Sequence, residues 1–139
     1  RAEDLAKPGY KLVLADKDVP VGAYSLTLLE NLARKMNDAA IKDKVLANVV
    51  SYENNVRAVF NKVALGEVDA GIVYLTDAIG ESSNKVEKII IPDDINVISK
   101  YFIAPIGDSP YPDLARHFIE LVLSEQGQAV LAKYGFQKP

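Results

Sequence analysis

Short apolar runs alternate with amphipathic stretches through roughly the first ninety residues. The run 11–15 follows the Pro8-Gly9 turn and stops at Asp16, which is typical of a buried strand. Beyond a loop, apolar residues recur in steps of one and three positions and predict an amphipathic helix from about Gly22 to Met36. These apolar residues are Leu28, Leu29, Leu32, Ala33 and Met36.

The same patterns predict the elements that follow along the chain. A short polar helical stretch ends near Lys44. A second amphipathic helix starts near Val56, with Asn54 or Asn55 as its N-cap, and stops at Gly66. Apolar runs that predict further strands occupy residues 47–51, 70–75 and 86–91.

The last forty or so residues have a different pattern. The run 97–106 is unusually long for a strand, and helices are predicted at about 114–123 and 125–134. Strands that alternate with helices in the earlier part indicate βαβ units, and hence an α/β fold with a mostly parallel sheet and helices on both faces. We therefore expect residues 1–96 to form one domain and residues 97–139 to leave it and pack elsewhere.

Composition narrows the classes of function. The 139 residues include 16 Lys or Arg, 19 Asp or Glu and no Cys, so disulfides, thiolate nucleophiles, Cys-based zinc sites and iron–sulfur ligation are excluded. A pI near 5.2 without a basic cluster argues against nucleic acid as a partner. No apolar run approaches the roughly 20 residues that would span a bilayer. The chain begins at Arg1 without a signal-peptide pattern, which predicts a processed, trimmed or cut chain.

No catalytic constellation stands out in the sequence. The single histidine, His117, lies in a predicted helix, where an isolated histidine is usually structural. Four aspartates near turns could serve as ligands of a hard metal, but turns favour Asp for local hydrogen bonding. We therefore predict that the protein is not an enzyme and has no metal held directly by side chains. The four aspartates are Asp16, Asp18, Asp93 and Asp94.

Two loops lead from the end of a predicted strand into the start of a helix. They occupy residues 18–24 and 52–57, and Gly22 allows close backbone approach in the first. Helix N-termini at the carboxyl ends of parallel strands expose unpaired amides, and an anion is their natural ligand. The amides near Val21 and Val56 are the candidates. The alternative, that these valines merely begin helices, stays open because every βαβ fold has such termini.

Three motifs resemble the periplasmic molybdate-binding proteins of bacterial ABC importers. They are the Val-Pro-x-Gly-x-Tyr loop within residues 11–24, Glu-Asn-Asn-Val-Arg at 53–57, and Gly-Ile-Val-Tyr-Leu-Thr-Asp-Ala within 66–78. The ending over 124–136 is similar too, although many solute-binding proteins share it. The resemblance implies a periplasmic-binding-protein-like fold of type II. Residues 1–96 then correspond to the second lobe, and 97–139 to a hinge strand and C-terminal helices of a first lobe.

The resemblance also implies the ligand and its site. Molybdate or tungstate is bound as the oxyanion without a cofactor, through the backbone amides of Val21 and Val56 and the hydroxyl of Tyr74. Arg57 neighbours the site but is not predicted to be a ligand. Members of that family carry an upstream segment, absent from this sequence, that builds most of the first lobe and supplies the opposite half of the site. The further partner is an ABC permease, and the location is the periplasm or, as a lipoprotein, the cell surface.

Two other classes of function stay open. An effector-binding domain of a transcriptional regulator shares the bilobed architecture, and an α/β enzyme would need a motif outside this sequence. The sequence does not determine whether molybdate or tungstate binds more tightly, because backbone amides contact the oxygens and do not distinguish the two central metal atoms. Apolar residues of the last two helices form a stripe that we expect the missing N-terminal segment or a second copy of the chain to cover, in preference to a fold-back onto the first ninety residues. The stripe consists of Leu114, Phe118, Leu121, Val122, Val130, Leu131 and Tyr134.

Overall fold

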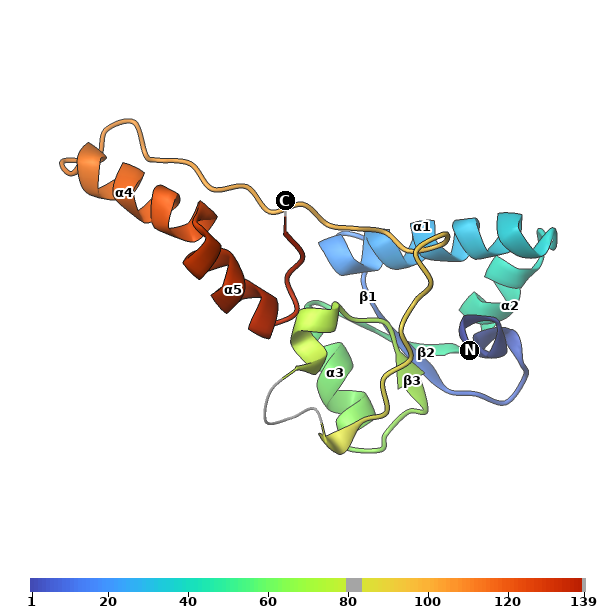
Figure 1. Ribbon diagram of the computed structural model, residues 1–139. Coiled ribbons are helices and arrows are strands. Elements are labelled where there is room, and N and C mark those ends of the chain that lie inside the picture. Colours follow the sequence, from blue (N-terminus) through green and yellow to red (C-terminus); the bar gives the residue numbers. More distant parts are fainter. Residues whose placement is uncertain (80–83, 139) are drawn as a thin grey trace. The chain divides into compact units, whose positions relative to one another are not determined.

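The computed structural model describes residues 1–79 and 84–138 (Figure 1). The chain divides into two compact units, residues 1–98 and residues 99–139. The first unit contains a sheet and most of the helices, and the second contains two helices with their flanking segments. The assignment of these parts to two lobes of a binding protein stays a prediction.

A parallel sheet with strand order β2-β1-β3 organises the first unit. Its strands are β1 (Leu12–Ala15), β2 (Val49–Glu53) and β3 (Ala70–Gly71). All four residues of the central strand β1 are buried, which explains its uninterrupted apolar sequence. The register pairs Ala15 with Glu53 and Val13 with Gly71, so the carboxyl ends of the strands lie at the same edge.

Helices cover both faces of this sheet. Alternate residues of β1 face opposite sides, so Val13 packs with Val59 of α3 (Val56–Ala64), whereas Leu12 packs with Leu29 of α1 (Pro20–Met36). Figure 1 shows α1 and α3 on the two sides of the strands, with the short helix α2 (Ile41–Ala47) next to α1. The predicted mostly parallel sheet with helices on both faces is confirmed.

Local capping explains the ends of the two main helices. Pro20 begins α1, and Asn37 ends it in the left-handed conformation with φ of 50°. For α3, Asn55 is the N-cap, and its side-chain oxygen accepts a hydrogen bond from the Ala58 amide at 2.8 Å. Gly66 follows this helix with φ of 73°, which agrees with the predicted end of the helix.

Three predicted strands differ in the structure. The strand predicted over 70–75 is confined to Ala70–Gly71, and residues 86–91 and 97–106 form no strand. A β-strand requires a hydrogen-bonded neighbour, and none pairs with these segments in the part of the chain that the structure describes. Ile95 is instead buried and Ile91 is half-buried, by packing with α1, α2 or the N-terminal 3₁₀-helix η1 (Ala2–Ala6).

The second unit is built around α4 (Pro112–Leu123) and α5 (Glu125–Lys133). Ser124 joins them, and its hydroxyl accepts a hydrogen bond from the Gly127 amide at 3.1 Å. A Cβ atom on Gly127 would lie 2.1 Å from the Leu121 carbonyl oxygen, so this joint requires glycine. Within the same unit, the rings of Tyr101 and Phe136 meet edge to face with centroids 5.7 Å apart.

The predicted apolar stripe on these two helices is largely exposed. Leu114 has 65% of its surface exposed and Phe118 has 59%, and α4 contains no buried residue. Of the other members, Leu121, Val130 and Tyr134 are exposed, and Val122 and Leu131 are half-buried. No helix in the described ranges is long and apolar enough to cross a bilayer.

Candidate functional site

The three predicted ligand residues follow three neighbouring strands of the sheet. Val21 comes after β1, Val56 after β2 and Tyr74 after β3. All three side chains pack in or against one apolar cluster around Val13 and Val59. The carboxyl edge of a parallel sheet is where α/β folds bind ligands, so the structure places the three residues together at a suitable position.

The start of α1 offers one backbone donor. Val19 is the N-cap without a side-chain cap, Pro20 has no N–H, and the Gly22 amide donates to the Val19 carbonyl at 2.8 Å. The amide of Val21 has no acceptor among the residues that the structure describes. It is therefore able to donate to a bound anion, next to the partial positive charge of the helix N-terminus.

Gly22 allows the start of α1 to lie close to the end of β1. A Cβ atom at this position would be 2.0 Å from the Asp16 carbonyl oxygen and 2.6 Å from that of Ala15. Such distances are far below van der Waals contact, so any larger residue would displace the helix start. The close approach predicted from the sequence is thus an approach to the protein's own backbone.

The start of α3 offers further donors. The Asn55 side chain satisfies the Ala58 amide, whereas the amides of Val56 and Arg57 have no acceptor in the described part of the chain. The Val56 side chain is half-buried against the apolar cluster. This second helix start therefore has the same capacity to bind an anion as the first.

Tyr74 is positioned by a turn that follows β3. It is half-buried and is the N-cap of the 3₁₀-helix η2 (Leu75–Ala78). Its carbonyl accepts a hydrogen bond from the Asp77 amide at 3.1 Å. The Tyr74 ring meets the ring of Tyr24 from α1 edge to face, with centroids 6.3 Å apart and an angle of 65° between the planes. This aromatic pair connects the third strand to the first helix.

Two of these neighbours were not among the residues predicted from the sequence to bind the anion. Tyr24 and Asp77 both lie within the quoted motifs, as the tyrosine of Val-Pro-x-Gly-x-Tyr and the aspartate after Leu-Thr. Their positions within these motifs were the feature of the sequence that could have identified them. Periodicity gave no such signal, because neither residue belongs to the apolar pattern that defines a helix or a strand.

Charged residues near the helix starts are mostly engaged in local interactions. The guanidinium carbon of Arg57 lies 5.3 Å from the centroid of the Phe60 ring, a cation–π contact, and the side chain is exposed. Glu53, at the end of β2, forms an ion pair with Lys62 at 2.5 Å and accepts a hydrogen bond from Ser51. These interactions hold the pKa of Glu53 below its ordinary value.

Two of the four aspartates considered as metal ligands have other partners. Asp16 accepts a hydrogen bond from the Asp18 amide at 3.0 Å, and Asp94 forms an ion pair with Lys35 at 2.7 Å. His117 is exposed on α4, in the second unit. Among the described residues, no group of three or more His, Cys, Asp or Glu side chains could hold a metal ion. The donors at the strand ends are backbone amides and a phenol, which suit an anion held by hydrogen bonds.

Comparison with known proteins points to one class of protein. Residues 1–137 match the family described as bacterial extracellular solute-binding protein. The molybdate-binding protein ModA of Mycobacterium tuberculosis is 35% identical over 136 residues, which cover 98% of this chain and 48% of ModA. YvgL of Bacillus subtilis, named as an ABC transporter substrate-binding lipoprotein, is 32% identical over 121 residues, or 86% of this chain and 43% of YvgL.

A solved structure has a similar fold. It is assigned as the substrate binding domain of a molybdenum ABC transporter from Clostridium difficile, with a TM-score of 0.73 and 26% sequence identity. The match covers 100% of this chain and 58% of that chain. This chain therefore spans about half the length of the curated relatives that it matches.

Proposed function

Because this chain belongs to the bacterial extracellular solute-binding protein family, we propose that it is part of the binding component of a molybdate or tungstate ABC importer. The resemblance to molybdate-binding proteins noted in its motifs is confirmed by the similarity to ModA. The predicted periplasmic-binding-protein-like fold is confirmed by the solved substrate binding domain. No similar protein supports the alternative of a transcriptional regulator's effector domain better.

One observation carries the proposal. Three sets of hydrogen-bond donors follow three adjacent parallel strands: the Val21 amide, the amides at the start of α3 from Val56, and the Tyr74 phenol. Their side chains pack in or against one cluster, which fixes the helix starts and the turn relative to one another. Backbone amides without an acceptor in the described part of the chain, together with a phenol, are donors that suit an oxyanion.

A donor-only site explains selectivity among oxyanions. Molybdate and tungstate are fully ionised near neutral pH and accept hydrogen bonds at every oxygen. Phosphate still carries a proton there, and a site without an acceptor leaves that proton unsatisfied. Sulfate lacks the proton but is smaller, so amides fixed on helix starts cannot close around it. We therefore expect neither phosphate nor sulfate to compete well.

The remaining parts of the proposal concern the whole protein. It acts by binding and release without catalysis, outside the cytoplasmic membrane in the periplasm or as a lipoprotein on the cell surface, and delivers the anion to a membrane permease. The other half of the anion's donors comes from a first lobe. The missing N-terminal segment that builds this lobe, or a second copy of the chain, covers the apolar stripe of α4 and α5.

Calorimetric titration of the intact natural protein tests this function. Molybdate and tungstate are expected to bind at least about a hundredfold more tightly than sulfate or phosphate, because each unmatched hydrogen-bonding group costs about 1–3 kcal/mol. Micromolar binding of phosphate at neutral pH would contradict a donor-only site. Absence of binding for all four anions would contradict the proposed function itself.

A further inference from the structure

Asp77 is a half-buried carboxylate immediately beside the proposed site, and the donor set described above does not use it. It lies in η2, and its amide donates to the carbonyl of Tyr74 at 3.1 Å. Its oxygen Oδ2 is buried and has no hydrogen-bond partner among the residues that the structure describes. Burying an unsatisfied acceptor destabilises a protein, so this carboxylate calls for a functional explanation.

Residues of two helices lie near Asp77 or near Tyr74, its hydrogen-bond partner. From α3, which packs against η2, comes the positive charge of Arg57, although its guanidinium lies over the Phe60 ring. From α1 comes the phenol ring of Tyr24, which contacts Tyr74. Desolvation raises the pKa of Asp77, and a backbone hydrogen bond from Tyr74 and the charge of Arg57 act in the opposite direction.

Two consequences follow from this geometry if Tyr74 binds an anion. The backbone hydrogen bonds between Asp77 and Tyr74 hold the turn that presents the phenol. The ionised carboxylate also repels a dianion, because like charges interact strongly in a partly buried site. A protonated carboxyl removes the repulsion and keeps the oxygen that accepts the hydrogen bond.

Resting on the proposed function, we propose that Asp77 is a positioning residue for Tyr74 whose protonation makes oxyanion binding tighter as the pH falls. The negative charge beside the site then favours release at higher pH and retention at lower pH. The device needs no movement of the fold, since only the charge on a side chain that is already in place changes.

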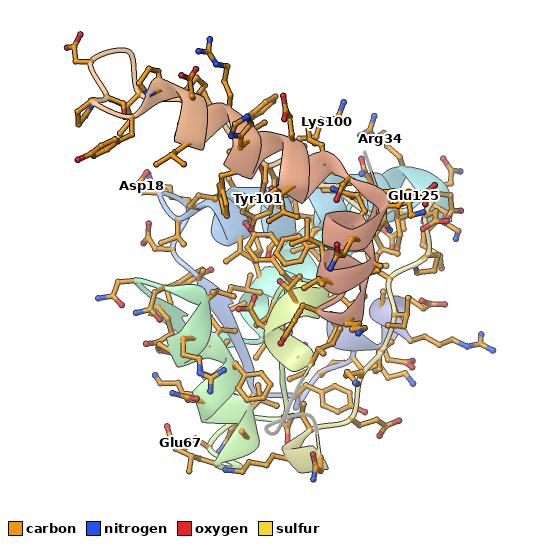
Figure 2. All side chains as sticks on the ribbon, turned by 60° about the vertical axis from the view of Figure 1, so that its left-hand side comes forward. Asp18, Arg34, Glu67, Lys100, Tyr101 and Glu125 are labelled. Atoms are coloured by element: carbon orange, nitrogen blue, oxygen red, sulfur yellow. The ribbon has the colours of Figure 1, made fainter. Side chains whose placement is uncertain are left out.

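Burial raises the pKa of Asp77 from its ordinary value, so molybdate titration of the intact natural protein from about pH 8 down to about pH 4.5 tests this inference. Asp77→Asn keeps the size and the acceptor of the side chain but removes the charge, whereas Asp77→Ala removes both. Glu67→Gln is the matched control, because Glu67 is exposed and follows the C-terminal end of α3, away from the helix start (Figure 2). It loses the same formal charge at a distance from the site.

The wild type and the control are expected to bind more tightly as the pH falls, by at most about tenfold per pH unit for one linked proton. Asp77→Asn is expected to bind tightly with a smaller dependence on pH. Asp77→Ala is expected to bind more weakly than Asp77→Asn at every pH, because the turn at Tyr74 loses the hydrogen bond from the Tyr74 backbone to the Asp77 side chain and keeps only the bond from the Asp77 amide. A merely structural role would not change the slope against pH in the Asn variant.

Equal slopes for the wild type and Asp77→Asn would overturn the proton linkage. Equal affinities for the Asn and Ala variants would overturn the positioning role. The pH profile of Asp77→Asn decides the proposal even when Asp77→Ala does not fold. Failure of the proposed function is a different result, namely a wild type that binds neither molybdate nor tungstate at any pH.

Discussion

The two units of this chain differ in how far their apolar side chains are buried. In the first unit, Leu29 and Val45 have no exposed surface and pack with β1 between helices. In the second, Leu114 and Phe118 leave 65% and 59% of their surface exposed. A fully buried Leu or Phe contributes roughly 1.5–3 kcal/mol to stability, and an exposed one contributes little. The first unit therefore has its own core, whereas the helices of the second bury little apolar surface.

Alanine substitutions at one glycine of each unit are expected to differ most in their effect on the free energy of unfolding. Gly22→Ala is expected to lower the free energy of unfolding by more than about 4 kcal/mol, because the new Cβ would lie 2.0 Å from the Asp16 carbonyl oxygen. Gly107→Ala, with no atom within 4 Å of its Cβ position, is expected to stay within about 0.5 kcal/mol. Urea unfolding measures both variants. A small effect at Gly22 would show that the start of α1 shifts easily.

Two leucines compare the packing of the units directly. Leu29→Ala is expected to lower the free energy of unfolding by about 3 kcal/mol, because it leaves a cavity beside β1. Leu114→Ala in the same 139-residue chain is expected to cost less than about 1 kcal/mol. A large loss at Leu114, together with a sedimentation coefficient above that of a monomer, would mean that a second copy covers the stripe.

One tyrosine from each unit tests whether, within the described part of the chain, only the first unit contributes to anion binding. In the intact natural protein, Tyr74→Phe is expected to weaken molybdate binding by about 1.5–3 kcal/mol, the usual contribution of a hydrogen bond to a charged group. Tyr134→Phe, which alters an exposed tyrosine after α5, is expected to leave the affinity unchanged. Calorimetry measures both. Binding as tight as the wild type in Tyr74→Phe would remove this phenol from the site.

Breaking one ion pair in each unit is expected to give the smallest difference in stability between the two units. The pKa of Glu53 is lowered in the folded state by Lys62 and Ser51, so its contribution to stability is present above the unfolded-state pKa and is lost as the pH falls through the folded value. Glu53→Gln is therefore expected to destabilise the chain slightly near pH 7 and much less near pH 3. Asp113→Asn, which breaks the exposed pair with Arg116, is expected to change neither measurement. Thermal unfolding at the two pH values provides the comparison.

Local features of the sequence were sufficient to predict much of the fold. The amphipathic faces of α1 and α3, the buried run of β1 and the glycine after α3 depend on neighbours within a few residues, so their pattern is visible along the chain. The alternation of strands and helices likewise predicted a parallel sheet. The predicted start at Gly22 was two residues late, because Pro20 already adopts the first helical position.

These sequence patterns could not predict which distant segments pair as β-strands. The apolar runs 70–75, 86–91 and 97–106 have the composition of strands, but a strand exists only where another strand offers its amides and carbonyls. The described chain provides such a partner only for the first two residues of the first run. Ile91 and Ile95 pack against the helices without belonging to a strand. An apolar run looks the same in the sequence whether its residues pack in this way or form a β-strand.

The candidate site shows the same division. The sequence by itself predicted that helices follow the strands, and the motifs identified Val21, Val56 and Tyr74 as candidate ligands. Only the tertiary structure decided the order β2-β1-β3, which puts the segments after the three strands side by side. It also decided that Asn55 rather than Asn54 is the cap and that Tyr24 and Asp77 contact or hold Tyr74. The physical reason is that capping and close contacts depend on distances between atoms of separate segments, and those distances arise only when the β1 strand is buried between its helices.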